Sequence, residues 1–395
     1  MYPRIFFLCW AFCLNFGIAA PAPVRNTDDR AIEARGTTYP SVSGRLFNIA
    51  GKTQYFSGTN AWYLGHLTSN ADVDQAMSQI AASGLKTARV WGFGTTNNAA
   101  TETNVYYQVL NSSGQYFNMD ANTGIGRLDY VVSAAKTYGI QLVLPLLNNF
   151  DALGGINTYI NAYGGTHASF YTDAKSQAAY KNYIKFIVNR YKSSTSIFSW
   201  ELCNEPRCSG CASSVITSWA TTISAYIKSL DTNHMVSLGD EGWLQPSYAG
   251  GDGTYAYSGY EGVDFVKNLA IKTIDYGTFH MYPDSWGYNY SWGNTWISQH
   301  NAIGKAAGKP VVLEEYAAPT VALQEQYLPQ WQSTTLSQTS IAADAFWQFA
   351  TTFADGTNPY DGYAIYYNAT AGSDYQKLGV AHAKAMAAKT ATASL

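Results

Sequence analysis

Short apolar runs alternate along the chain with longer stretches in which apolar residues recur every three or four positions. The short runs predict eight β-strands, at Gln54–Thr59, Thr87–Gly92, Gln141–Asn148, Ile197–Asn204, Met235–Asp240, Tyr276–Tyr282, Val311–Tyr316 and Ala345–Ala350. The amphipathic stretches predict helices at Val73–Ser83, Arg127–Tyr138, Ser176–Tyr191, Ser214–Ser229, Trp296–Ala307, Leu323–Ser337 and Asp374–Lys389. Eight strands that alternate with helices predict an α/β protein with the (β/α)8 architecture of a TIM barrel, in one domain.

The N-terminus indicates export from the cell. Arg4 precedes an apolar stretch from Ile5 to Ala20, and Pro21-Ala-Pro23 follows it. A basic residue followed by a short apolar run predicts a signal peptide over residues 1–20, because the run is too short to span a bilayer. The polar residues up to Arg35 predict a short pro-segment over 21–35, which leaves 36–395 as the folded domain of a secreted, extracellular protein.

Composition and charge narrow the class of ligand. The net charge is only −3 and charged residues make up 13% of the chain, without long runs of one sign. This balance argues against a nucleic-acid or anionic-membrane partner and is compatible with a monomer. Aromatic residues reach 15%, and rings and amides together are typical of proteins that bind neutral sugars. A secreted, glycosylated surface without a sugar ligand would have the same composition.

The cysteines fit an oxidising compartment. Cys208 and Cys211 are close enough in sequence to form a small disulfide, although a redox motif or half of a zinc site has the same spacing. Cys203 is then a small buried apolar residue. Glycosylation sequons at Asn111, Asn289 and Asn368 fit a secreted glycoprotein.

Two predicted strands end in carboxylates. The run that contains Trp200 leads into Asn204-Glu205-Pro206, where the proline ends the strand, and the run after Pro310 leads into Glu314-Glu315. Side chains at the C-terminal tips of barrel strands project into the barrel mouth. Two carboxylates placed there can hydrolyse a glycosidic bond by double displacement. For Glu205 the alternative is a structural role as a helix-capping acid.

Motifs along the whole mature chain resemble glycoside hydrolase family 5, and within it the fungal endo-β-1,4-mannanases. The matching segments are Phe56-Ser-Gly-Thr-Asn-Ala-Trp62, Ala71-Asp-Val-Asp74, Gly84-Leu-Lys-Thr-Ala-Arg-Val-Trp-Gly-Phe93, Trp200-Glu-Leu-Cys-Asn-Glu-Pro-Arg-Cys208, Leu238-Gly-Asp-Glu-Gly-Trp243, Gly277-Thr-Phe-His-Met-Tyr-Pro283, Val312-Leu-Glu-Glu-Tyr316 and Phe346-Trp-Gln348. The resemblance implies a secreted retaining glycosidase that cleaves internal β-1,4-mannosidic bonds. Its partners would be β-mannan-type polysaccharides and oligosaccharides of plants. The mechanism requires no cofactor, and no metal-ligand spacing is evident in the sequence.

The resemblance assigns the two catalytic roles. Glu205 corresponds to the acid/base, which must start protonated and is therefore expected to have a raised pKa. Glu315 corresponds to the nucleophile, because it directly precedes an aromatic residue. Neighbours in a strand point to opposite sides, so Glu314 is expected to point outward toward the helices or to form a structural ion pair. Arg89, on a buried strand, needs a carboxylate partner, and we expect Glu315 to be that partner rather than another lumen carboxylate.

The remaining residues that the resemblance places in the substrate site surround these carboxylates. Asn204 would bind the 2-hydroxyl of the reacting sugar, and His280 and Tyr282 would line the −1 subsite. Trp347 corresponds to the floor of that subsite, although core packing is the commoner fate of a tryptophan. Arg207 corresponds to an aglycone-subsite arginine. Stacking platforms for further sugar units are expected at Trp62, Trp91 and Trp243.

Three departures from the family pattern bear on the shape of the cleft. They are the segment Tyr63-Leu-Gly-His66, the pair Ala317-Ala318 after the nucleophile motif, and Cys203 before Asn204. An exo-acting β-mannosidase and a β-1,4-glucan-cleaving relative therefore remain alternatives within the same enzyme class. A non-catalytic carbohydrate-binding barrel is a third alternative, but every position that the chemistry requires is filled.

Overall fold

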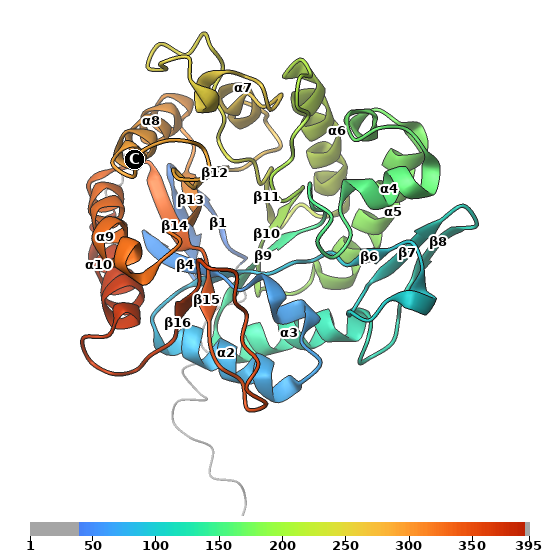
Figure 1. Ribbon diagram of the computed structural model, residues 1–395, viewed down its shortest axis with the longest axis horizontal. Helices are drawn as coiled ribbons and strands as arrows, with labels where there is room; N and C mark the ends of the chain where they lie inside the picture. The colour runs from blue at the N-terminus through green and yellow to red at the C-terminus, as the bar shows by residue number, and fades with distance from the viewer. Residues whose placement is uncertain (1–38, 392–395) are drawn as a thin grey trace, which may run out of the picture. The chain divides into compact units, whose positions relative to one another are not determined.

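Eight parallel strands form the inner wall of a barrel in the computed structural model, which describes residues 39–391 (Figure 1). In chain order they are β4 (Phe56–Asn60), β5 (Thr87–Arg89), β9 (Gln141–Pro145), β10 (Ile197–Glu201), β11 (Met235–Ser237), β12 (Gly277–Met281), β13 (Val311–Tyr316) and β14 (Ile341–Phe346). Strands that follow one another in the chain are neighbours in the sheet, and β14 pairs with β4. The predicted (β/α)8 fold is confirmed.

The seam between β11 and β12 is closed by a loop. The backbone N–H of Asp275 donates to the carbonyl of Val236 over 2.8 Å, and the Asp275 carboxylate accepts from the N–H of Val236 over 2.6 Å. Further along, the N–H of His280 donates to the carbonyl of Glu241. These bonds join the two ends of the sheet, so the carboxyl ends of all eight strands face one mouth.

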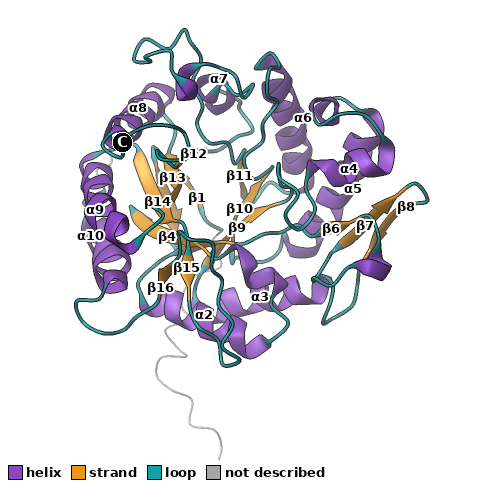
Figure 2. Ribbon diagram, viewed as in Figure 1, coloured by secondary structure: helices purple, strands orange, loops and turns teal. Residues whose placement is uncertain are grey.

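Helices surround the strands as an outer ring (Figure 2). They are α2 (Asn70–Ala82), α3 (Ile125–Tyr138), α4 (Ile156–Tyr163), α5 (Ala174–Tyr191), α6 (Ser214–Leu230), α7 (Phe265–Leu269), α8 (Trp292–Ala307), α9 (Val321–Ser337) and α10 (His382–Ala388). Local signals set their ends: the Ser69 and Asp173 side chains cap α2 and α5, and Gly308 ends α8 in the left-handed conformation. All the predicted helices overlap observed ones, and α4 and α7 were not predicted.

The eighth strand differs most from its prediction. It spans Ile341–Phe346, four residues earlier than the predicted start at Ala345, while Phe349–Ala350 forms the short strand β15 and pairs with β16 (Ile365–Tyr366). The segment from 341 to 345 contains three alanines and an aspartate, which are weak strand formers. Its neighbours β13 and β4 make it a strand. The predicted helix Asp374–Lys389 likewise divides, with a π-helical segment Gln376–Ala381 before α10.

A small antiparallel sheet that the sequence did not predict closes the far end of the barrel. It consists of β1 (Ser41–Ser43), β2 (Leu46–Ile49) and β3 (Lys52–Gln54). Its Phe47 is fully buried, with ring centroids 5.0 Å from Phe198 and 5.2 Å from Tyr276. Because both partners lie near the starts of barrel strands, this sheet plugs the N-terminal end and leaves the opposite mouth for function.

A second unpredicted sheet lies in the long connection between β5 and α3. It contains β6 (Thr95–Thr96), β7 (Gln108–Asn111) and β8 (Gly114–Phe117), and it extends from the ring beside α4 and α5 (Figure 1). Within residues 39–391, no helix is long and apolar enough to cross a membrane. The predicted signal peptide and pro-segment lie outside the described residues.

Removing the plug's central ring is expected to destabilise the whole barrel. Phe47→Ala should lower the free energy of unfolding by about 3–5 kcal/mol, because it removes a large buried ring and leaves a cavity. Tyr116→Ala, whose side chain is 55% exposed in β8, is the control and should change it by less than about 0.5 kcal/mol. Guanidinium unfolding followed by tryptophan fluorescence measures both, and equal losses would contradict the role of the plug.

Candidate active site

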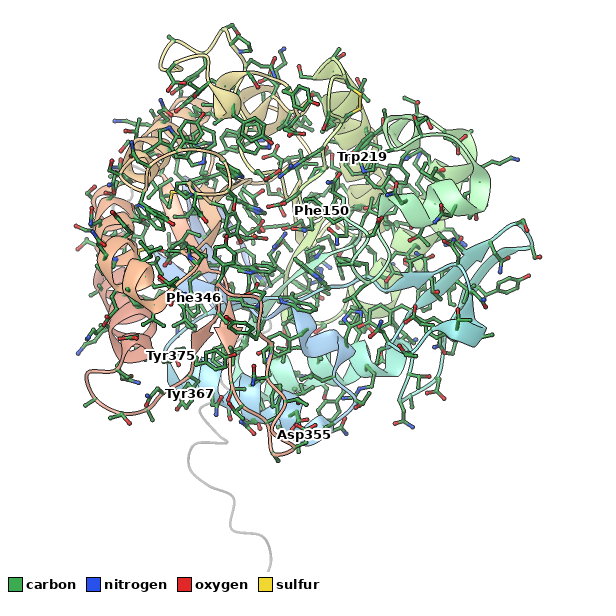
Figure 3. The ribbon with its side chains drawn as sticks, in the orientation of Figure 1. Phe150, Trp219, Phe346, Asp355, Tyr367 and Tyr375 are labelled. Atoms are coloured by element: carbon green, nitrogen blue, oxygen red, sulfur yellow. A yellow bond between two sulfur atoms is a disulfide. The ribbon has the colours of Figure 1, made fainter. Side chains whose placement is uncertain are left out.

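A cavity of about 510 Å³ opens at the carboxyl ends of the strands. A cavity at this end of a (β/α)8 barrel is where such proteins place their chemistry. It is lined by Trp62, Trp91, Asn148, Phe150, Ala152, Asn204, Glu205, Arg207, Glu241, Tyr282, Ser285, Trp286, Glu315, Trp347, Asp361 and Tyr363. Phe150, labelled in Figure 3, lies inside the ring of helices.

Glu205 lies in the loop that follows β10. The strand itself ends at Glu201, but single hydrogen bonds keep the following residues beside the chain that leaves β11. The Glu205 N–H, for example, donates to the carbonyl of Gly239. The φ angle of Glu205 is 48°, in the left-handed region that non-glycine residues rarely adopt. Such a conformation persists only where the surroundings impose it, and it is typical of functional turns. Here it directs the carboxylate into the cavity.

Glu315 lies in β13 on the opposite side of the cavity. One carboxylate oxygen accepts a hydrogen bond from the Tyr282 hydroxyl over 2.6 Å, and the other accepts from Nη1 of Arg89. The side chain is 4% exposed. Two donors supplied by the protein therefore hold this carboxylate in one orientation.

The two carboxylates lie close together. One oxygen of Glu205, one of Glu315 and one nitrogen of His280 lie within 4.8 Å of one another. Retaining glycosidases hold their carboxyl groups roughly 5 to 5.5 Å apart, whereas inverting ones leave room for a water molecule. The close approach favours the retaining geometry.

His280 lies between the carboxylates of Glu205 and Glu314. Its Nδ1 lies 2.7 Å from an oxygen of Glu205, and its Nε2 lies 3.4 Å from Glu314. Burial lowers the pKa of His280, but the charge of Glu315 and the hydrogen bonds to Glu205 and Glu314 raise it well above its usual value overall. Its nitrogens therefore carry protons toward the carboxylates and do not offer free lone pairs to a metal ion.

The pKa of Glu205 does not follow the expectation. Burial raises it, but the hydrogen bond and charge of His280, together with Arg207, lower it overall. For Glu315, burial and the charge of Glu205 raise the pKa against His280 and Arg89. The expectation of a raised pKa at Glu205 is therefore wrong, because the His280 proton lies against this carboxylate.

Arg89 pairs with Glu315, as expected, and also holds three other side chains. Its guanidinium is 1% exposed and donates to Asn60, Glu201 and Asn204 over 2.7 to 3.2 Å. Asn204 accepts from Arg89 and donates to the Asn148 side chain over 3.0 Å. This fixes the Asn204 amide, which lines the cavity beside Glu205.

The expectation that only one of Glu314 and Glu315 faces the barrel interior is wrong. Opposite β12, Leu313 pairs with Phe279 and Glu315 pairs with His280, so Glu314 is an extra residue in a β-bulge. The bulge interrupts the regular alternation of side chains between the two faces of the strand. Glu314 therefore lies inside the barrel, 3.5 Å from Nε of Arg89, in the ion pair that was the other expectation for it.

Aromatic rings line one side of the cavity. The Trp91 ring lies 6.4 Å from Trp62 and 5.9 Å from Trp347 between centroids, and the Trp347 indole N–H donates to Asp361 over 2.5 Å. Their flat faces suit the apolar faces of pyranose rings. Trp62, Trp91 and Trp347 thus lie where a sugar could stack on them.

Arg207 lies on the other side of the cavity. Its guanidinium makes a bidentate pair with Glu241 over 2.6 and 2.7 Å and lies 5.4 Å from the Phe150 ring. The disulfide between Cys208 and Cys211, predicted from their spacing, closes the turn directly after Arg207. Cys203 is free and buried, as expected.

Three residues assigned to the substrate site, Arg89, His280 and Trp243, do not line the cavity. Arg89 and His280 are 1% and 0% exposed, and they contact the cavity-lining Glu315 and Glu205 from the barrel interior. Trp243, expected as a stacking platform, is 2% exposed. Its ring packs 4.3 Å from Trp286 and its N–H donates to Glu241, so it supports Arg207 through Glu241 instead of facing a sugar.

Several lining residues were not predicted. Trp286, Asp361 and Tyr363 lie in long loops, where no periodic pattern shows which side chain turns inward. Glu241 stood within the matching motif that ends at Trp243, and Phe150 followed the third predicted strand. Their positions at strand ends were the signals that would have found them.

Comparisons with known proteins agree with this geometry. Residues 160–372 match a family model described as GH family 5 beta-mannosidase-like. A mannan endo-1,4-beta-mannosidase A from Aspergillus aculeatus is 48% identical over 377 residues, which cover 95% of this chain and 97% of the relative. The chain belongs to glycoside hydrolase family 5.

Other relatives of this glycoside hydrolase carry similar names. A mannan endo-1,4-beta-mannosidase A from Podospora anserina is 49% identical over 329 residues, covering 83% of this chain and 87% of the relative. The solved structure of an endo-1,4-beta-mannanase from Rhizomucor miehei superposes with a TM-score of 0.81 at 37% identity, covering 89% of this chain and 99% of that one. The family resemblance in the sequence is therefore confirmed.

Asp240, which follows β11 beneath the cavity, is a buried acid that couples stability to pH. It is 2% exposed and accepts a hydrogen bond from the Asn268 side chain over 2.8 Å. Burial raises the pKa of Asp240 to about 7, against the hydrogen bonds from Asn268 and Gly242. In the unfolded chain an aspartate has a pKa of about 3.9.

Between about pH 4 and about pH 7 the folded protein therefore binds a proton at Asp240 that the unfolded chain has lost, so stability falls as pH rises through this window. The wild type should lose unfolding free energy between about pH 5 and about pH 8. In Asp240→Asn this loss should be smaller by at least about 1 kcal/mol. The exposed Asp151→Asn is the control and should follow the wild type. Denaturant unfolding at a series of pH values measures this, and parallel curves for Asp240→Asn and wild type would contradict it.

Proposed function

We propose that this glycoside hydrolase is a retaining endo-β-1,4-mannanase that cleaves internal β-1,4-mannosidic bonds of mannan-type plant polysaccharides. The observation that carries the proposal is the approach of the Glu205 and Glu315 carboxylates to within 4.8 Å across an open cavity. At this separation one carboxylate can attack the anomeric carbon while the other protonates the leaving oxygen.

In the first step Glu315 is the nucleophile. Arg89 and Tyr282 orient its carboxylate by donating to both oxygens. It attacks the anomeric carbon as Glu205 donates a proton to the glycosidic oxygen, which leaves with the rest of the chain. Asn204, fixed by Arg89 and Asn148, is placed to bind the 2-hydroxyl of the sugar, where interactions strengthen in the transition state.

In the second step Glu205 acts as the base. Esterification removes the negative charge of Glu315, and the loss of a nearby like charge lowers the pKa of Glu205. Glu205 then takes a proton from water, and the water attacks the anomeric carbon from the side that the leaving group vacated. The ester bond to Glu315 breaks, and the product keeps the β configuration.

The relatives support the choice of substrate and of internal cleavage. Both curated relatives described above are named mannan endo-1,4-beta-mannosidases. The cavity is lined by Trp62 and Trp347, which follow β4 and β14, and by Arg207 and Trp286, which follow β10 and β12. An internal segment of a polysaccharide needs binding surfaces on both sides of the bond that breaks.

The site of action follows from the sequence and the disulfide. We propose that residues 1–20 are a signal peptide, that residues 21–35 are a pro-segment and that 36–395 is the catalytic domain, which acts as an extracellular monomer on neutral polysaccharides. The Cys208–Cys211 disulfide supports export, because disulfides persist in oxidising compartments.

Digestion of mannan tests the proposal directly. The protein should release a series of mannooligosaccharides from β-mannan and leave carboxymethylcellulose largely intact, as chromatography of the products will show. Mannose alone as the first product would indicate an exo-acting β-mannosidase. Release of oligosaccharides from carboxymethylcellulose but not from mannan would indicate a glucanase. Cleavage of neither polymer would contradict the proposal and favour the non-catalytic alternative.

The same digestion reports stereochemistry. Proton NMR in the first minutes should show the β-anomer of the new reducing end before mutarotation mixes the anomers, since the two carboxylates leave no room for an inverting water. The α-anomer as first product would exclude double displacement.

Azide rescue is expected to separate the two catalytic roles. Glu205→Ala and Glu315→Gly should each lose at least about a hundredfold in kcat on an activated aryl β-mannoside. Azide should restore turnover in both, giving the β-mannosyl azide with Glu205→Ala and the α-mannosyl azide with Glu315→Gly. The matched control is Glu314→Ala, which disturbs Arg89 and should yield no azide product. An α-azide from Glu314→Ala would move the nucleophile to that residue.

A further inference from the structure

Glu201 is a buried carboxyl group to which the proposed mechanism gives no role. It ends β10 with 0% exposure, and its Oε1 accepts from both Nε and Nη2 of Arg89, over 3.1 and 2.7 Å. Its other oxygen, Oε2, is buried and has no hydrogen-bond partner among the donors of the described residues. A carboxylate oxygen left without a donor in the interior is strongly unfavourable, so this oxygen requires a proton or a donor.

The neighbour of Glu201 is a second carboxyl group. Nε of Arg89 lies 3.1 Å from Glu201 and 3.5 Å from Glu314, so both acids converge on one N–H. Glu201 and Glu314 are therefore close neighbours, since both lie within 3.5 Å of the same nitrogen. Two ionised carboxylates so close together would repel, whereas a carboxylic acid and a carboxylate share a strong hydrogen bond.

The charges around the barrel axis lead to the same arrangement. Four carboxyl groups, Glu201, Glu205, Glu314 and Glu315, face two cations, Arg89 and protonated His280. Arg207 lies 3.9 Å from Glu205, but its shorter contacts are with Glu241 and Glu261, at 2.6 and 3.6 Å, so it adds no cation beside Glu201 and Glu314. If all four were ionised, two negative charges would be left uncompensated in the interior, which favours a proton on one of these carboxyl groups.

The other groups that face this pair cannot supply the missing charge. The remaining titratable groups near Glu201 and Glu314 are Tyr180, Cys203, Asp240 and Tyr276. None of them is a cation. Burial raises the pKa of Glu201 well above its usual value, with Arg89 opposing and Glu314 adding to the rise. For Glu314 burial acts in the same sense, but Arg89 and His280 outweigh it and lower the pKa.

We infer that Glu201 and Glu314 share one proton, carried on Oε2 of Glu201, and that Glu201 acts as a neutral positioning residue for Arg89. The proton leaves Glu201 able to hold the guanidinium in place through two hydrogen bonds without neutralising its charge. The charge of Arg89 then remains available to Glu315 and Glu314. The role in catalysis depends on the proposed function, but the shared proton does not.

Infrared difference spectroscopy near neutral pH tests the proton without any substrate. The spectrum of wild type minus Glu201→Gln should contain the carbonyl band of a protonated carboxylic acid, and this band should shift in deuterium oxide. The exposed Asp151→Asn is the control and should show loss of carboxylate bands only. Loss of carboxylate bands from Glu201→Gln would overturn the inference.

If Glu201→Gln does not fold, Glu314→Gln gives the same distinction. With a shared proton, removing Glu314 lets Glu201 ionise beside Arg89, so the acid band disappears and the number of carboxylates is unchanged. If both groups are ionised in the wild type, a carboxylate band disappears instead.

The pH profile tests the positioning role. Glu201→Gln removes no charge if Glu201 is neutral, so the alkaline limb of kcat/KM should stay within about 0.3 pH unit of wild type. An ionised Glu201 would make the same change remove a negative charge near Glu205, and the limb would move down by about one unit. Glu201→Ala should lower kcat by about tenfold or more with KM changed less than about threefold, because Arg89 loses two anchoring bonds. A Glu201→Gln variant as impaired as Glu201→Ala would contradict the positioning role.

Discussion

The buried guanidinium of Arg89 is the constraint on which the barrel mouth depends. A charge at 1% exposure is strongly unfavourable unless every N–H finds an acceptor. Its acceptors come from Asn60 at the end of β4, Glu201 at the end of β10, Asn204 in the next loop, and Glu314 and Glu315 in β13. One side chain of β5 therefore fixes the relative positions of segments that are more than two hundred residues apart in the chain.

That constraint explains why β13 departs from regular geometry. A regular strand would point Glu314 away from the lumen, whereas the bulge brings both glutamates to Arg89. Glu205 shows the same principle in the backbone, since its left-handed φ of 48° directs the carboxylate to His280. Irregular backbone thus occurs at the two residues that need a specified direction, while the plug around Phe47 stabilises the opposite end.

The sequence predicted the barrel because strands and helices alternate eight times, and it placed Glu205 and the Glu314-Glu315 pair at strand ends. The family resemblance selected Glu315 from that pair, and the need of a buried arginine for a carboxylate predicted the Arg89–Glu315 contact. The sequence could not predict how deeply each of these side chains is buried. Arg89, His280 and Trp243 are the residue types that a sugar site uses, but their burial depends on neighbours from other strands. The bulge at Glu314 depends on pairing with β12, which no local pattern reveals. Trp286 and Tyr363 turn inward only because long loops fold back over the mouth.

The order of the two pKa values is a property of the Glu205–Glu315 pair and not of either glutamate alone. Glu205 has a lowered pKa because His280 donates to it, yet it borders the cavity at 8% exposure, so a bound neutral sugar removes the remaining water and raises its pKa. Glu315 depends on Arg89 and Tyr282 rather than on water for its stabilisation. When Glu205 takes up the proton, the like charge that raised the pKa of Glu315 disappears, and Glu315 stays ionised. In the proposed mechanism, filling the cavity therefore places the proton on Glu205 and leaves the negative charge on Glu315.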